Sequence, residues 1–540
     1  MKMSIHPKHM LLACSIFLSA FSFGQTMEKA IQLTKNEEFD LADKAFKSLI
    51  NAQPSNGALY FYEGENFFEW GKMDSAQAAY QKGITINATN ALNYTGLGKV
   101  QWYNGNSKDA LDNFYKAKVI SKSKDAVVLD KIAEAYINAP TKDIRTAIDL
   151  LNQATVIDPK NTDVLIDMGD AYLSQNDGSS AVSYYEKATS INSVNVVAML
   201  RLGQLYGRAR NYDLSFQYFQ RATIADSNFA PAYRAKAEML YSANRIDEAI
   251  GQYKKYLQLN NATDARIRYA SFLYLAKKYP DAIKEIQTIF QKDTSSTILY
   301  RIMGYSLYEA GKYKDGLDYI NKFFAKAAIT KTKVLPSDYA YQGKLLSKNG
   351  KDSLAIEKMK QALVRDSSDA ADLYTQIANI YYKNGNYPLA VKYFSMRVKL
   401  PQPTVNDYNG LGRAAYSNRQ YQKADSAFAI ITKYMADLPL GYLWRAYCNS
   451  SIDSMGTQGL AKPFYEQYIQ KAAKDSLKNK DGLINAYDYL GYYYVTIKDF
   501  DKATYYYKKT MELDPNDTKA ASFFKNLKAL KQPGKKEGDK

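Results

Sequence analysis

The residues that most often carry out acid–base, nucleophilic or metal chemistry are nearly absent from this chain. Its two histidines, His6 and His9, and one of its two cysteines, Cys14, lie in the first 24 residues; only Cys448 lies beyond them. Those 24 residues have the pattern of a removable export signal. Without them the chain has no Cys-His or Ser-His-Asp set, no histidine-based zinc site and no intramolecular disulfide. We therefore expect a protein that is not an enzyme and that binds no metal or cofactor.

Two glycine motifs and one pair of acids are the remaining candidates for chemistry. Gly96-Leu97-Gly98 and Gly410-Leu411-Gly412 do not complete the glycine pattern of a phosphate-binding loop, and neither follows a predicted strand. Asp167 and Asp170 lie three residues apart on a predicted helix surface with no cleft visible in the sequence. We interpret the glycines as packing residues and the acids as solvated.

Arginine and tyrosine recur at a regular spacing, which indicates binding rather than catalysis. Four arginines follow one another at steps of 33, 34 and 33 residues: Arg201, Arg234, Arg268 and Arg301. Six of the 48 tyrosines occupy two neighbouring repeat positions: Tyr241, Tyr274, Tyr305, Tyr308, Tyr382 and Tyr416. Tyrosine and arginine contribute much of the binding energy at protein interfaces. The arginines could bind an acidic ligand, or they could pair with nearby acids such as Glu238 or Asp264.

Acidic residues precede the arginine column on the same predicted side of the molecule. They are Asp130, Glu134, Asp163, Asp167 and Asp170. On this side of the molecule we therefore expect the two preceding repeats to be acidic and the next four repeats to be basic.

The elements that would position these side chains follow from a repeat of about 34 residues. A small residue recurs in one column along the chain: Ala30, Gly64, Gly98, Ala133, Gly169, Gly203, Ala237, Ala270, Gly304, Gly343, Ala378, Gly412, Ala446 and Gly491. A second small column, which begins with Ala42, Ala76 and Ala110, follows further along each repeat. Bulky residues lie three or four positions after each small one, on the same helical face. The pattern predicts pairs of amphipathic helices that pack closely at the small residues.

This spacing resembles the tetratricopeptide repeat, with its small eighth residue, aromatic eleventh, alanine twentieth and aromatic twenty-fourth. The last full unit carries the clearest match: Leu490-Gly491-Tyr492-Tyr493-Tyr494, Ala503, Tyr507 and Pro515. The resemblance covers nearly all of the chain after the signal. It implies an all-α, superhelical solenoid of about 14 helix-turn-helix repeats with a C-terminal capping helix.

The repeat period also predicts how the chain is divided. We expect a signal peptide at 1–24, repeats 1–9 at 25–334, repeats 10–14 at 335–517, a capping helix at 518–531 and a disordered tail at 532–540. Extra residues around Ala327 to Pro336 interrupt the period, so we place a hinge or sub-array boundary there.

The resemblance further implies a function, because the first helices of tetratricopeptide repeats line a concave, partner-binding groove. We expect the four arginines and six tyrosines to line that groove, with Arg234 and Arg301 facing it more directly than Arg201 and Arg268. The predicted partner is a protein or peptide with an acidic segment. The alternative is an envelope-structural protein whose basic face binds anionic glycan or lipid headgroups, since the chain carries a net charge of +17. No clustered run of Lys and Arg indicates nucleic acid.

The export signal determines the expected location. Lys2 and Lys8 precede an apolar run that ends near Gly24, so Gln25 would begin the exported protein. We expect a periplasmic or outer-membrane-associated protein, similar in layout to exported proteins of the Bacteroidota. Lipidation of Cys14 is the alternative to cleavage after Gly24. The side of the outer membrane, the oligomeric state and the partner stay open.

Overall fold

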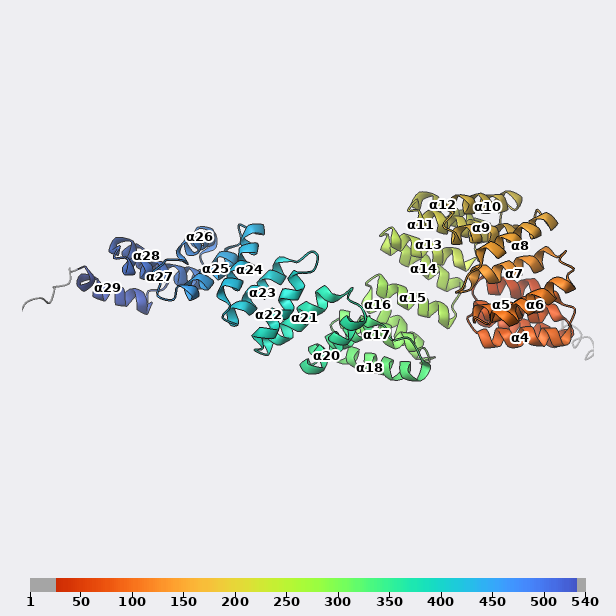
Figure 1. The fold of residues 1–540 in the computed structure, drawn as a ribbon, viewed down its shortest axis with the longest axis horizontal. Coiled ribbons are helices and arrows are strands. Elements are labelled where there is room, and N and C mark those ends of the chain that lie inside the picture. The colour runs from red at the N-terminus through yellow and green to blue at the C-terminus, as the bar shows by residue number, and fades with distance from the viewer. Residues whose placement is uncertain (1–25, 532–540) are drawn as a thin grey trace, which may run out of the picture. The chain divides into compact units, whose positions relative to one another are not determined.

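The computed structural model describes residues 26–531, and every regular element in that range is a helix. The helices form two compact units, divided between Thr294 and Ser295, which we call unit 1 and unit 2 (Figure 1). The predicted signal peptide at 1–24, with Cys14, and the predicted tail at 532–540 lie outside the described residues. None of the helices from residue 26 to residue 531 is both long enough and apolar enough to cross a membrane.

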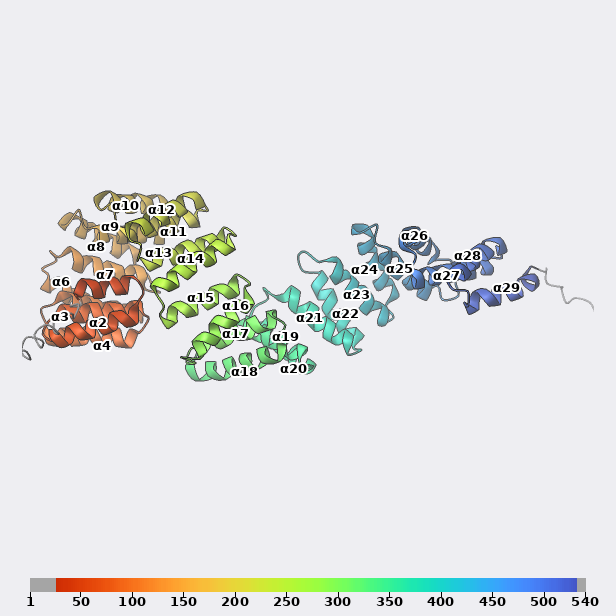
Figure 2. The same cartoon turned by 180° about the vertical axis from the view of Figure 1, so that it is seen from behind.

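Unit 1 consists of eight consecutive helix pairs, seen from two sides in Figures 1 and 2. Its helices are α1 (Met27–Lys35), α2 (Phe39–Ala52), α3 (Gly57–Glu69), α4 (Met73–Ile86), α5 (Ala91–Tyr103), α6 (Ser107–Ile120), α7 (Ala126–Asn138), α8 (Ile144–Ile157), α9 (Thr162–Ser174), α10 (Gly178–Ile191), α11 (Val196–Arg208), α12 (Tyr212–Ala225), α13 (Ala230–Ser242), α14 (Ile246–Leu259), α15 (Thr263–Leu275) and α16 (Tyr279–Phe290).

Unit 2 consists of six further pairs and one last helix. Its helices are α17 (Thr297–Glu309), α18 (Tyr313–Thr330), α19 (Pro336–Lys348), α20 (Asp352–Arg365), α21 (Ala370–Lys383), α22 (Tyr387–Val398), α23 (Val405–Ser417), α24 (Tyr421–Tyr434), α25 (Pro439–Ile452), α26 (Lys462–Ala472), α27 (Lys480–Thr496), α28 (Phe500–Leu513) and α29 (Thr518–Leu530), with a 3₁₀ turn (Ala473–Asp475) after α26. The fourteen pairs and the capping helix α29 confirm the predicted all-α repeat fold.

The two small-residue columns pack as the sequence predicts. A Cβ added at Gly64 would lie 2.3 Å from the ring of Tyr80, and one added at Gly169 would lie equally close to Tyr185. The aromatic residue of the second helix therefore rests directly on the backbone of the first. The alanines of the second column, such as Ala181, are fully buried, so the helices meet without a gap.

In twelve of the fourteen helix pairs, the turn within the pair contains one left-handed residue. The φ angle is 77° at Gly71 and 62° at Asn176, for example. Glycine adopts this conformation without steric cost, and asparagine tolerates it. Other pairs place a charged residue there, and in the first pair that residue is Glu37, with a φ of 63°.

The insertion at 327–336 is not a boundary between units. It extends α18 to 18 residues and continues into α19, so both sides of it belong to unit 2. The division at 294/295 lies one repeat before the predicted division at 334/335. Insertion length alone did not reveal it, because extra residues can lengthen a helix without separating its neighbours.

Candidate functional site

The four arginines of the repeat column are all bound to carboxylates of this chain. Arg201 Nε lies 3.0 Å from Asp170 Oδ1, and Arg234 Nη1 lies 2.9 Å from Glu238 Oε1. Burial alone would lower the pKa of Arg234, but the Glu37 and Glu238 carboxylates raise it above its ordinary value. Of the two interpretations that the sequence leaves open for this column, pairing with acids of the same chain is the one that the structure shows, with Glu238 among the expected partners.

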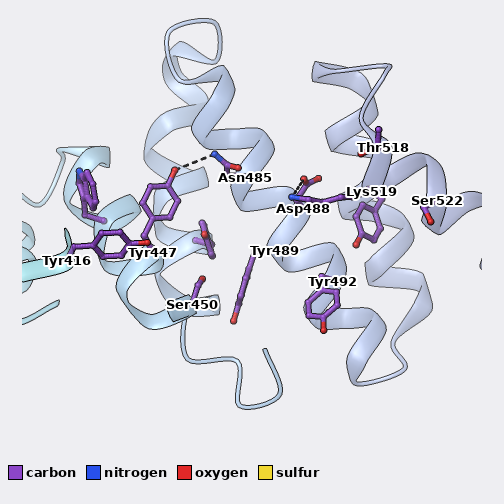
Figure 3. Close-up of a pocket in the computed structure, with 13 residues that line it drawn as sticks. Tyr416, Tyr447, Ser450, Asn485, Asp488, Tyr489, Tyr492, Thr518, Lys519 and Ser522 are labelled. Atoms are coloured by element: carbon purple, nitrogen blue, oxygen red, sulfur yellow. Dashed lines mark hydrogen bonds and ion pairs between the residues drawn. The ribbon is translucent and has the colours of Figure 1, made fainter. Parts of the chain in front are cut away.

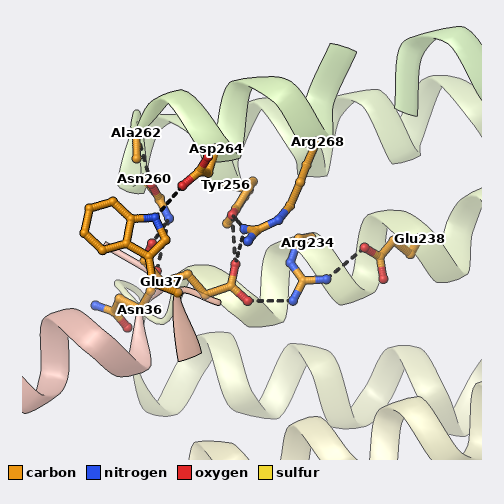
Figure 4. A network of polar contacts seen from close by, with 10 residues as sticks. Asn36, Glu37, Arg234, Glu238, Tyr256, Asn260, Ala262, Asp264 and Arg268 are labelled. Carbon is orange, nitrogen blue, oxygen red and sulfur yellow. Dashed lines mark hydrogen bonds and ion pairs between the residues drawn. The ribbon is translucent and has the colours of Figure 1, made fainter. Parts of the chain in front are cut away.

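The central two arginines share a partner from the other end of unit 1 (Figure 4). Glu37, in the turn between α1 and α2, places Oε1 2.6 Å from Arg234 Nη2 and Oε2 2.9 Å from Arg268 Nη1. The Tyr256 hydroxyl donates to the same carboxylate at 2.9 Å. The buried Asn260 amide donates to the main-chain oxygens of Glu37 at 3.0 Å and Asn36 at 3.3 Å. The first repeat thus contacts α13, α14 and α15.

Arg301 has a structural position rather than a groove position. It is 8 % exposed, and Asp338 is fully buried. Arg301 Nε donates to Asp338 Oδ1 at 2.8 Å and Nη2 donates to Oδ2 at 2.9 Å, which joins α17 to α19. Tyr305 donates its hydroxyl to the same carboxylate and stacks on Tyr341. The expectation that Arg301 faces the groove is wrong, because a buried carboxylate requires the guanidinium.

The predicted acidic side of unit 1 is a compensated ion network. Lys99, only 2 % exposed, lies 2.9 Å from Glu65 and 2.8 Å from Glu134, and Lys131 also binds Glu134. Burial would lower the pKa of Lys99, but Glu134 and Glu65 raise it above its ordinary value. Burial raises the pKa of Asp130 to about 6, against the attraction of Lys131. The network holds α3, α5 and α7 together and offers no unshielded acid–base pair.

The predicted tyrosines do not form one continuous surface. Tyr241 donates its hydroxyl to the Leu275 oxygen, and Tyr274 lies against Tyr279, both in unit 1. Tyr305 is buried, and Tyr308 contacts Tyr313. Tyr382 and Tyr416, further along unit 2, line two separate cavities.

Tyr416 lines a cavity of about 910 Å³ within unit 2 (Figure 3). Helices α23, α25, α27 and α29 supply most of its wall. The lining residues are aromatic or small and polar, apart from one charged pair, Asp488 and Lys519: Tyr416, Trp444, Tyr447, Ser450, Tyr465, Asn485, Asp488, Tyr489, Tyr492, Tyr507, Thr518, Lys519 and Ser522. We call this cavity the tyrosine pocket.

The aromatic rings of the tyrosine pocket are fixed by contacts with one another. Tyr416 meets Trp444 edge to face at 5.4 Å, and Tyr465 lies 4.8 Å from Tyr489. Tyr492, at the rim, is 48 % exposed, and its hydroxyl lies 3.5 Å from the Met455 oxygen. The rings are therefore placed before a ligand arrives, which lowers the entropy cost of binding.

The polar groups of the tyrosine pocket are mostly neutral. Asn485 donates to the Tyr447 hydroxyl at 3.4 Å, and Lys519 lies 3.1 Å from Asp488. Burial raises the pKa values of Tyr447 and Tyr489, so both hydroxyls stay protonated at neutral pH. The pocket can therefore stack on apolar or planar groups and exchange hydrogen bonds with main-chain amides.

Sequence reasoning identified Tyr416 but missed most of its companions. Ser450, Asn485 and Asp488 come from helices that the pattern treated as ordinary repeats, and Lys519 comes from the predicted capping helix. A signal was present, since the repeat at 439–483 is lengthened next to this pocket. Its extra loop is ordered by Asp453, which accepts hydrogen bonds from the amides of Gln458 and Gly459.

The comparisons with known proteins agree with the fold. The tetratricopeptide repeat family model matches residues 166–231 and 200–262. The C-terminal part of a TPR repeat-containing protein from Cytophaga hutchinsonii is 37% identical; the match covers 47% of this chain and 98% of that one, with a TM-score of 0.42. A tetratricopeptide repeat protein from Parabacteroides merdae is 17% identical; the match covers 46% of this chain and 98% of that one, with a TM-score of 0.33.

Two curated relatives match shorter stretches. The TPR repeat-containing protein YpiA of Bacillus subtilis is 24% identical over 213 residues, which is 39% of this chain and 49% of that protein. The mitochondrial import receptor subunit TOM70 of Rattus norvegicus is 28% identical over 93 residues, 17% of this chain and 15% of that protein. The chain thus spans half or less of the curated relatives it matches. Tetratricopeptide-repeat proteins generally mediate protein–protein interactions and are typically non-catalytic. The repeat columns, the paired helices and the Cytophaga relative together show that this chain belongs to the tetratricopeptide-repeat family.

Proposed function

We propose that this chain is a non-catalytic scaffold of the bacterial envelope that binds a partner protein in the tyrosine pocket. The observation that carries the proposal is the pocket itself: preplaced aromatic rings and neutral hydrogen-bonding groups around about 910 Å³. Aromatic anchors in a concave site are the usual source of binding energy in protein complexes.

The chemistry of the pocket favours an extended peptide segment. Tyr447, Asn485 and Ser450 offer hydroxyl and amide groups that can form hydrogen bonds with a peptide main chain, while Trp444 and Tyr492 offer ring surface. The cation Lys519 is bound to Asp488, so the pocket holds no unpaired charge that would select an acidic ligand. We infer that the partner's side chains enter by shape and stacking rather than by charge.

Site-specific photo-crosslinking in cells tests this proposal. A photoreactive phenylalanine at position 492, on the pocket rim, should form one specific adduct with a protein partner. The matched control is position 505 on α28, where Tyr505 is 56 % exposed but does not line the pocket. Equal adducts from both positions would contradict the pocket. Crosslinks that still form after the pocket residues are substituted, but that are lost in high salt, would favour the basic-face alternative.

The envelope location is part of the same proposal. It is supported by the signal pattern of residues 1–24, with cleavage before Gln25. The intact mass of the exported protein tests it: a chain beginning at Gln25 is expected. A lipid-modified N-terminal Cys14 would instead establish the lipoprotein alternative and anchor the protein to a membrane.

A further inference from the structure

The contact between the two ends of unit 1 has the features of ligand recognition. Arg234, Tyr256 and Arg268 surround one carboxylate with three donors, and Asn260 binds two successive main-chain oxygens. Guanidinium groups favour carboxylates, and a side-chain amide can donate hydrogen bonds to the main-chain carbonyls of a peptide of any sequence. Together the four side chains recognise a turn whose second residue is acidic. Here that turn is Asn36-Glu37, about 200 residues away in the sequence.

The four side chains of this site are also held in place by contacts that do not involve Glu37. Asn260 is fully buried at the end of α14, and its Oδ1 accepts the Ala262 amide, which fixes the orientation of its side chain. The Arg268 guanidinium also donates to the Tyr256 hydroxyl at 2.9 Å. Arg234 is held from the other side by Glu238. All of these supporting contacts lie within α13, α14, α15 and the connection between α14 and α15. The site therefore keeps its shape when the Asn36-Glu37 turn leaves it.

The contact is also separable from the rest of the fold. Each repeat packs mainly against its sequence neighbours, and helix packing between the first two repeats and α13–α15 is slight. Side chains make the connection, with a second hydrogen bond of 2.7 Å from the Trp70 indole to Asp264. Arg268 is 39 % exposed and Arg234 is 23 % exposed, so solvent and salt reach the ion pairs. Small bends accumulated over several repeats would separate the two ends.

We propose that Arg234, Tyr256, Asn260 and Arg268 form a binding site for an acidic peptide segment of a partner, which the Asn36-Glu37 turn occupies in cis. The partner segment displaces the turn and opens unit 1. An internal ligand competes at an effective concentration in the millimolar range, so a free peptide binds weakly until the turn is removed. The site lies in unit 1 and does not depend on the tyrosine pocket, so either proposal can fail alone.

The binding test uses the chain from Gln25 onward and a fluorescein-labelled peptide with the sequence of residues 32–41. We expect Glu37→Ala to bind this peptide saturably and at least about ten-fold more tightly than the wild type, because its site is vacant. Adding Arg234→Ala and Arg268→Ala should abolish that gain. The matched control is Glu28→Ala on α1, an exposed acid, which should behave like the wild type. Equal affinity of wild type and Glu37→Ala, or binding indifferent to the two arginines, would overturn the proposal.

A distance measurement keeps the proposal testable if Glu37→Ala is poorly behaved. Spin labels at the exposed positions Lys44 on α2 and Lys255 on α14, each changed to cysteine, report on the two ends. Cys448, the one cysteine in the chain from Gln25 onward, is buried and its thiol pKa is raised to about 12, so it does not compete for the label. We expect one short distance in low salt and longer, broader distances in 1 M salt or after Arg268→Ala. An unchanged distribution under both conditions would contradict a releasable contact.

Discussion

Unit 1 and unit 2 present their inward-facing side chains in different ways. The three predicted arginines of unit 1 are charged, and the chain itself supplies each partner: Asp170 for Arg201, and Glu37 for Arg234 and Arg268. In the tyrosine pocket of unit 2 the groups are aromatic hydroxyls and amides, which water can satisfy until a ligand arrives. A charged residue that recurs along a repeat protein is therefore better interpreted as part of an internal ion pair until the structure shows whether it is paired. Neutral aromatic residues remain available for binding.

The largest effect should come from the one arginine of the column that is buried in unit 2. Arg301→Ala leaves the Asp338 carboxylate buried without its guanidinium, so we expect a loss of about 3–5 kcal/mol in the free energy of unfolding. Urea denaturation followed by circular dichroism measures it. The control, Arg245→Ala, removes an exposed ion pair with Glu248 and should change little. A small effect of Arg301→Ala would mean that the ion pair with Asp338 contributes little to the stability of unit 2.

The ion network of unit 1 should give stability an unusual pH dependence. The raised pKa of Asp130 means that the folded state binds this proton more tightly than the unfolded state does. Its contribution to stability is therefore full at low pH and is lost as pH rises from about 4 to 6, by about 1.4 kcal/mol for each pH unit.

Urea midpoints measured between pH 4 and pH 6.5 should separate this contribution from other titrations. The urea midpoint of the wild type should fall relative to that of Asp130→Asn as pH rises from 4 to 6.5, because only the wild type loses the contribution of this proton. Asp149→Asn, at an exposed acid on α8 that is not among the charges acting on Asp130, is the control and should run parallel to the wild type. Parallel curves for Asp130→Asn as well would show that the network does not hold this proton.

Packing should not distinguish the two units, because both use the same small-residue columns. Ala181→Leu in unit 1 and Ala424→Leu in unit 2 replace fully buried alanines between paired helices. Overpacking should cost about 1–3 kcal/mol in each case. Lys187→Ala, at an exposed position of α10, is the control for the first and should have little effect. Tolerance of leucine at one site only would show that the repeats of that unit are loosely packed.

The sequence predicted the fold closely and the binding site poorly, for one physical reason. Helix pairing depends on contacts between residues close in sequence, such as Gly64 with Tyr80, and these leave a visible period. The contact of Glu37 with Arg234 and Arg268 joins the first repeat to the seventh and eighth and depends on the accumulated curvature of unit 1. Neighbour spacing does not reveal that curvature. The tyrosine pocket likewise combines α23 to α29 around a lengthened repeat, so only Tyr416 followed from its column.

One measurement tests the central contrast between the units directly. The partner segment that crosslinks to position 492 is titrated against the wild type, against Tyr447→Ala with Tyr492→Ala, and against Arg234→Ala with Arg268→Ala. We predict that the tyrosine variant binds at least about ten-fold more weakly at an unchanged melting temperature. The arginine variant should bind this segment like the wild type, since Arg234 and Arg268 bind Glu37 in the wild type and do not line the tyrosine pocket. Full affinity in the tyrosine variant, with binding lost in the arginine variant, would contradict the account.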